Sequence, residues 1–151
     1  MCDWSEVGGR PGEIVLLSRD TSSGTHVFFR DRVVRGDGEM PGAEYSDNAM
    51  FVPSTQFIVD EVAQNPAAIG YIGLGYLGDA VKAVNLLAGE SGVPISVIDG
   101  HRDGLPYPLT RPLFFYLVGG REGAADDYIE FVLGNTGQEI VRELNFVPVG
   151  E

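Results

Sequence analysis

The sequence is poor in the side chains from which disulfides and metal sites are made. Cys2 is its one cysteine, and His26 and His101 are its two histidines. A single cysteine excludes an internal disulfide and a cysteine metal cluster. So few thiolate and imidazole ligands also argue against a transition metal held by the protein. We therefore predict neither a metal nor a cofactor.

Positive charge is scarce as well. Ten lysines and arginines stand against 22 acidic residues, and the net charge is −12. A nucleic-acid binder needs a basic stripe along the phosphates, so these scattered basic residues argue against nucleic acid as a partner. The acidic field also opposes the approach of an anion, so an anion site in this protein must work through short-range hydrogen bonds.

Long apolar runs are missing too. The sequence has no stretch of eighteen apolar residues, so it predicts no membrane-spanning helix. A charged, then apolar, then small-residue leader does not open the chain, so we predict no signal peptide within it.

What the sequence does contain is the pattern of an α/β protein. Its 151 residues, 44% of them apolar, predict one domain over 1–151. Strands are predicted at 13–18, 67–76, 81–87 and 107–118, a short extended piece at 94–98, and helices at 25–34, 56–64, 126–133 and 136–144. Strands that alternate with helices favour a mixed sheet with helices on both faces.

Three local expectations follow from the helical patterns. Residues 53–55 precede the helix at 56–64 and are expected to cap it. On the helix at 25–34, the apolar residues Val27, Phe28 and Val34 are expected to face the sheet. Asn145 follows the last helix, where asparagine readily takes the left-handed conformation that ends a helix.

The most informative stretch is the turn after the first strand, Arg19-Asp20-Thr21-Ser22-Ser23-Gly24-Thr25. Backbone N–H groups at the start of a helix lack partners, and anions bind there readily. Gly24 allows a ligand close to the main chain, Ser23 and Thr25 add hydroxyl donors, and Arg19 adds a planar fork that fits an oxyanion. The alternative is an ordinary helix cap beside a surface arginine.

An enzymatic interpretation of the same residues is weaker. Ser23 and His26 could act as nucleophile and base, but no orienting acid is evident and no nucleophile-elbow pattern surrounds the serine. His101 stands alone in a turn. We therefore predict no catalytic residue and no enzyme.

Five blocks in the sequence carry a resemblance to a known family. They are Trp-Ser-Glu-Val-Gly-Gly (4–9), Arg-x-x-x-Ser-Gly-Thr (19–25), Asn-Pro-Ala-Ala-Ile-Gly-Tyr (65–71), Tyr-Pro-Leu-Thr-Arg-Pro-Leu (107–113) and Gly-Gln-Glu-Ile-Val (137–141). In this order, over nearly the whole chain, they resemble the later part of PstS-type phosphate-binding proteins, the extracytoplasmic receptors of phosphate ABC transporters.

The resemblance implies a fold and a site. The fold is that of type II periplasmic binding proteins, in which two α/β lobes close on an anion. Carried over residue by residue, the phosphate ligands are Arg19, Ser23, Gly24 and Thr25. Thr21 stands where the family often has an acidic residue, and His26 where relatives often carry arginine.

The blocks correspond to the second lobe and the C-terminal segment, without the family's leader and first-lobe segment. The resemblance therefore implies phosphate binding for uptake, with a transporter permease as partner in the full-length context. It also leads us to expect millimolar affinity at best from this chain alone, and either self-association or pairing with a first lobe. The alternative function is an interaction or sensor module that has lost tight solute binding.

Overall fold

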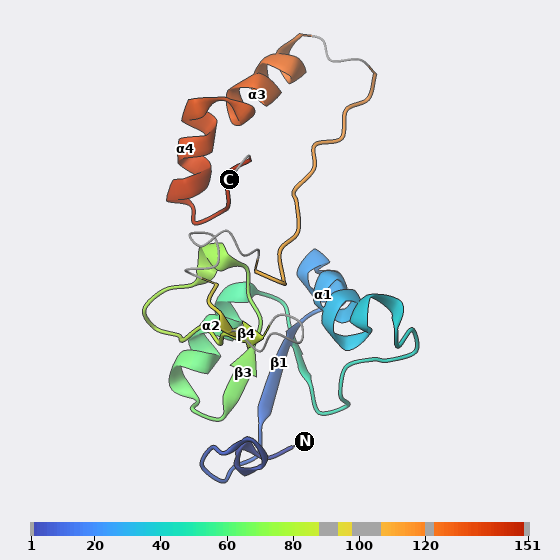
Figure 1. Ribbon diagram of the computed structural model, residues 1–151, viewed down its shortest axis with the longest axis vertical. Coiled ribbons are helices and arrows are strands. Elements are labelled where there is room, and N and C mark those ends of the chain that lie inside the picture. The colour runs from blue at the N-terminus through green and yellow to red at the C-terminus, as the bar shows by residue number, and fades with distance from the viewer. Residues whose placement is uncertain (1, 88–93, 98–106, 120–122, 150–151) are drawn as a thin grey trace. The chain divides into compact units, whose positions relative to one another are not determined.

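A computed structural model describes residues 2–87, 94–97, 107–119 and 123–149 of the chain. They fall into two compact units, Met1–Lys82 and Ala83–Glu151. The alternation of strands and helices confirms the α/β class predicted from the sequence (Figure 1). His101 lies outside the described residues.

The first unit is built on a parallel sheet of three strands. Its strands are β1 (Val15–Arg19), β2 (Met50–Val52) and β3 (Ala68–Gly70), in the order β2-β1-β3. In register, Arg19 pairs with Val52, and Leu17 pairs with both Met50 and Gly70. β1 is therefore the central strand, and its carboxyl end stands between its two neighbours.

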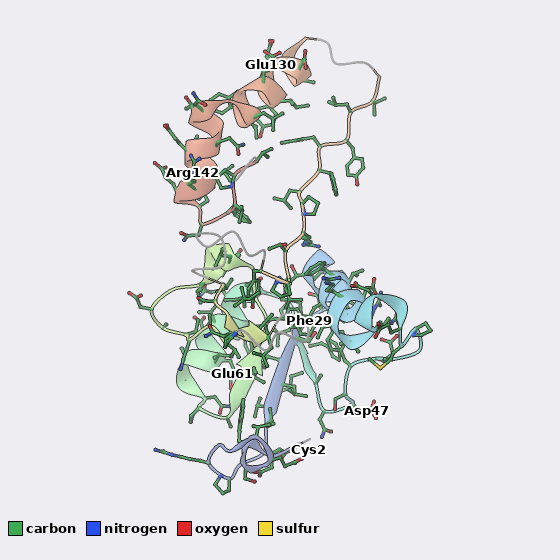
Figure 2. All side chains as sticks on the ribbon, viewed as in Figure 1. Cys2, Phe29, Asp47, Glu61, Glu130 and Arg142 are labelled. Carbon is green, nitrogen blue, oxygen red and sulfur yellow. The ribbon has the colours of Figure 1, made fainter. Side chains whose placement is uncertain are left out.

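Two helices connect these strands and cover opposite faces. The chain leaves β1 through α1 (Gly24–Phe29) to reach β2, then crosses back through α2 (Thr55–Gln64) to β3. Because crossovers between parallel strands are right-handed, a step to one side followed by a step to the other puts the helices on opposite faces. Leu17 of β1 packs with Ile58 of α2, whereas Ser18 lies beside His26 of α1, which agrees with this arrangement. Figure 2 labels Phe29 at the end of α1 and Glu61 in α2.

The apolar core lies on the α2 face. Its buried members are Leu17, Val52 and Ile58, with Val15, Val62, Ala68 and Ile72 packed around them. Gly70 permits this packing, because a Cβ there would lie 2.6 Å from Ile58 Cγ2 and 3.2 Å from the Leu17 carbonyl oxygen.

Side chains alternate along a strand, so the residue after Leu17 faces the other helix. This residue is Ser18, which is 2% exposed and lies beside His26 of α1. His26, not the predicted Val27, is the buried residue of α1, since Val27 is 39% exposed. The prediction failed because it considered only apolar residues for the buried face of this helix. A polar side chain such as His26 can also be buried when it has hydrogen-bond partners, here the Arg19 carbonyl.

The ends of the elements follow local signals. Ser54 caps α2 by accepting a hydrogen bond from the Phe57 amide at 3.1 Å, as predicted for this stretch. The predicted helix at 25–34 is α1 followed by a π-helical turn, Arg30–Val34. β2 has no counterpart among the predicted strands, because three residues are too few for an alternating pattern to show.

The second unit contains a helical hairpin and a short strand pair. The strands β4 (Leu86–Leu87) and β5 (Pro94–Ile95) are antiparallel, and the helices are α3 (Ala124–Leu133) and α4 (Asn135–Glu143). Parallel and antiparallel pairing thus occur in two separate sheets. The predicted left-handed residue is confirmed, because Asn145 has a φ of 58°.

The prediction of a strand at 107–118 was wrong. Figure 1 draws this stretch as a trace without an arrow, and residues 111–118 are exposed. A strand requires a neighbour for its backbone hydrogen bonds, and neither of the sheets among the described residues includes this stretch. An apolar run is therefore not sufficient to form a strand.

Candidate anion site

The predicted anion residues occupy one continuous turn at the carboxyl end of β1. Arg19 is the last residue of β1, Ser23 caps α1, and Gly24 and Thr25 are its first two residues. Ligands of open α/β sheets bind beyond the carboxyl ends of the strands, which is where this turn lies.

Hydrogen bonds within the turn hold its backbone. The Asp20 carboxylate accepts the Ser22 amide at 2.9 Å and the Ser22 hydroxyl at 2.5 Å. The Ser23 amide donates to the Asp20 carbonyl at 3.0 Å. The hydroxyl bond from Ser22 is the main reason that the pKa of Asp20 lies below its usual value. Asp20 therefore acts as an ordering residue of the turn.

Ser23 retains a free hydrogen-bonding function after capping the helix. Its oxygen accepts the Thr25 amide at 3.3 Å, which leaves the hydroxyl proton for another acceptor. Gly24 is exposed and has no side chain to cover its backbone. The turn can thus offer donors to a ligand without losing its cap.

The arginine side chain is anchored by a different turn. Nη1 of Arg19 donates to the Thr55 hydroxyl at 2.6 Å, and Nη2 donates to the Pro53 carbonyl at 3.0 Å. Each terminal nitrogen carries two protons, so one N–H on each is left for an oxyanion. Nε is buried and has no hydrogen-bond partner among the described residues. The sequence predicts a helix cap at residues 53–55 but not this second role, which no local pattern signals.

A polar cluster, in which Ser18 and His26 are buried and Tyr45 and Tyr71 are half-buried, lies under the turn on the α1 face. It comprises Ser18, His26, Tyr45 and Tyr71, which come from β1, α1, the loop before β2 and the end of β3. The Ser18 hydroxyl is 2.6 Å from that of Tyr71, and the two tyrosine hydroxyls are 3.0 Å apart. Tyr45 donates to the His26 carbonyl at 2.9 Å. Phe29 stacks on Tyr71, with ring centroids 4.0 Å apart.

Burial raises the pKa of Tyr45 well above its ordinary value, and the hydrogen bond with Tyr71 adds to this effect. An unfolded tyrosine ionises near pH 10. Below pH 10 the Tyr45 hydroxyl is protonated in both the folded and the unfolded protein, and its full contribution to the free energy of unfolding is present. Above pH 10 the unfolded protein loses this proton first, so the free energy of unfolding falls as the pH rises.

We therefore expect the free energy of unfolding to fall above about pH 10, by at most about 1.4 kcal/mol per pH unit for this one proton. Urea unfolding between pH 8 and 11 measures the slope. Tyr45→Phe should make it shallower. Tyr116→Phe is the control, because Tyr116 is 89% exposed. Equal slopes for both variants would contradict the assignment to Tyr45.

A hollow of about 350 Å³ lies beside α1 but is not the anion site. It shares only Thr21 with the turn, and its other lining residues include Arg30, Glu44 and Asp47. Two carboxylates against one guanidinium disfavour an anion there.

The described part of the chain offers neither a metal site nor a membrane-spanning helix. Within it, no three histidine, cysteine, aspartate or glutamate side chains gather into a possible metal site. None of its helices has both the length and the apolar character that crossing a bilayer requires.

The fold and the turn together define a class of binding protein. A family model described as the PBP superfamily domain matches residues 2–136, and the chain belongs to this family. The resemblance to PstS-type phosphate-binding proteins is also confirmed by curated relatives. The phosphate-binding protein PstS of Borreliella burgdorferi is 28% identical over 154 residues, covering 97% of this chain and 53% of that protein. PstS 2 of Streptococcus pneumoniae is 30% identical over 138 residues, covering 90% and 45%.

Solved structures agree on the fold. A phosphate-binding protein of a phosphate ABC transporter from Streptococcus pneumoniae matches with a TM-score of 0.65 and 30% identity, over 90% of this chain and 51% of that one. A possible phosphate-binding protein from Planctomyces limnophilus matches with a TM-score of 0.68 and 27% identity, over 99% and 54%. The chain thus spans about half the length of the relatives it matches.

Proposed function

We propose that this chain binds inorganic phosphate, or a closely similar oxyanion, through Arg19, Ser23, Gly24 and Thr25, as part of an ABC-transporter receptor for phosphate uptake. The observation that carries the proposal is the position of the four residues. They match the family's Arg-x-x-x-Ser-Gly-Thr motif and lie in one turn at the carboxyl end of the central strand. The relatives named for phosphate binding support this assignment.

The chemistry of the turn suits a tetrahedral oxyanion. Arg19 supplies N–H groups from an anchored fork, Ser23 a hydroxyl proton, and Gly24 an accessible backbone. In a receptor of this kind the chain would act outside the cytoplasm and deliver phosphate to a transporter permease.

The affinity of the 151-residue chain alone should be low. The resemblance assigns further phosphate ligands to a first lobe, and each hydrogen bond to a charged group is worth roughly 1.5–3 kcal/mol. Without three of them, binding weakens by on the order of a thousandfold or more. We therefore expect a dissociation constant in the millimolar range, and a submicromolar value for a monomer in calorimetry would contradict it.

A phosphate titration followed by backbone NMR tests the proposal. Saturable shifts are expected at the Gly24 and Thr25 amides, with little response to chloride at equal ionic strength. Ser23→Ala should weaken binding by about tenfold, since it removes one hydrogen bond to a charged group.

Ser54→Ala is the matched control, because Ser54 caps α2 as Ser23 caps α1, and losing a cap costs about 1 kcal/mol in either helix. Saturable shifts confined to other parts of the chain would overturn the proposal, and so would equal losses in the two variants.

A further inference from the structure

The imidazole of His26 joins the two ends of the anion turn. His26 is 3% exposed, and its Nδ1 lies 3.0 Å from the Arg19 carbonyl oxygen. This contact closes a loop from residue 19 to residue 26 that includes every residue proposed to bind phosphate. A single side chain from the first turns of α1 thus reaches back to the last residue of β1.

Two groups can donate to that carbonyl oxygen, Nδ1 of His26 and the Ser18 hydroxyl. The Tyr45 hydroxyl donates to the His26 carbonyl at 2.9 Å. Tyr71 can donate either to Ser18 at 2.6 Å or to Tyr45 at 3.0 Å. When Tyr71 donates to Ser18, the Ser18 proton goes to the Arg19 carbonyl at 3.1 Å.

The Arg19 carbonyl thus has His26 as a donor at 3.0 Å beside the Ser18 hydroxyl. A carbonyl can only accept, so Nδ1 of His26 carries a proton, and in the neutral ring the other nitrogen is bare. The rings of Tyr45 and Phe51 pack on the imidazole at centroid distances of 4.7 and 5.7 Å and help to hold its orientation.

The peptide group after Arg19 is thereby fixed at both of its polar atoms. Its carbonyl accepts from His26, while its N–H, that of Asp20, donates to the Val52 carbonyl at 3.0 Å. The orientation of this peptide decides how the turn leaves β1, and hence where the hydroxyl and backbone donors of residues 23–25 point.

From this geometry we propose that His26 is a positioning residue of the anion site. It does not contact phosphate. Its Nδ1–H orders residues 19–25 through the Arg19 carbonyl, so that the donors of the turn are preorganised for the ligand. The effect on affinity rests on the proposed phosphate binding, whereas the effect on the turn itself does not.

Two variants separate the hydrogen bond from the bulk of the ring. His26→Leu fills the space and removes the imidazole donor, so that the Arg19 carbonyl keeps only the Ser18 hydroxyl of its two donors. His26→Asn can restore the lost hydrogen bond, because its amide N–H occupies nearly the place of Nδ1–H. We expect His26→Leu to raise the phosphate dissociation constant by roughly fivefold, which is the equivalent of one lost hydrogen bond at about 1 kcal/mol. His26→Asn should stay within about twofold of the parent chain.

The matched control is Asn65→Ala. Asn65 accepts the Ala67 amide at 3.0 Å and donates to Glu61 at 3.1 Å, in the turn before β3 at the other end of the sheet. Its loss destabilises the unit without touching residues 19–26. An affinity loss in Asn65→Ala as large as that in His26→Leu would overturn the proposal, and so would an equal loss in His26→Leu and His26→Asn.

Two measurements do not depend on phosphate. Nitrogen NMR of the parent chain should show His26 protonated at Nδ1, and a bare Nδ1 would overturn the proposal even if the leucine variant fails to fold. Amide exchange at residues 20–25 should be faster in His26→Leu than in His26→Asn. A parent chain that passes both tests but does not bind phosphate would refute the proposed function alone.

Discussion

Arg19→Ala is expected to abolish the saturable phosphate response of the chain. The guanidinium can give an oxyanion two charge-assisted hydrogen bonds, each worth roughly 1.5–3 kcal/mol. Losing about 3 kcal/mol or more weakens binding by over a hundredfold. Because the parent chain is expected to have a millimolar dissociation constant, a phosphate titration of this variant by NMR should show no saturation at the Gly24 and Thr25 amides.

The net charge requires its own control, because removing any positive charge makes an acidic protein repel phosphate more strongly. Arg10→Ala changes the charge equally at an exposed position outside the turn, and it should leave binding nearly unchanged. Arg19→Lys keeps the charge but loses the planar fork, so it should fall between the parent and the alanine variant. Equal responses of the Arg19 and Arg10 alanine variants would refute direct contact.

The same phosphate titration can test the contact between Arg19 and Thr55. Thr55→Val removes the hydroxyl that Nη1 contacts at 2.6 Å while the charge stays in place. We expect it to bind more weakly than the parent and more tightly than Arg19→Ala, since a freed guanidinium must be ordered again when the anion binds.

Gly137→Ala is expected to disrupt the helical hairpin of the second unit. Gly137 is buried at the start of α4, where a Cβ would lie 2.4 Å from the carbonyl oxygens of both Phe131 and Val132. These are backbone atoms of α3, so the strain can be relieved only by moving one helix away from the other. Overpacking usually costs 1–3 kcal/mol, and we expect about 3 kcal/mol or more here.

A neighbouring side chain adds to this loss. Gln138 is buried, donates to the Val132 carbonyl at 2.7 Å and accepts the Val149 amide at 2.7 Å. A shift of α4 would break both bonds, which join α3 to the C-terminal segment.

Urea unfolding of the whole chain, followed through NMR signals of α3, measures the effect of Gly137→Ala. The control is Thr136→Ala, at an exposed position one residue earlier in α4. An unchanged midpoint for Gly137→Ala would show that the helices separate at little cost, contrary to this expectation.

The features that the sequence predicted correctly depend on short-range interactions. Ser54 and Asn145 were predicted at helix ends because a cap needs only a few neighbouring residues. The position of residues 19–25 in one turn before a helix was predicted for a similar reason, since these residues are adjacent in the chain, whereas their binding of an anion stays a prediction. The resemblance to phosphate-binding proteins came from the order of short motifs, which needs no coordinates.

Only the tertiary structure decided the long-range features. It paired the unpredicted β2 with β1, gave Arg19 its partners at residues 53–55, and buried His26 beside the hydroxyl groups of Ser18 and Tyr45. It also left residues 107–118 without a ladder among the described residues. These outcomes depend on contacts between segments distant in sequence, and no local pattern specifies which segments will meet.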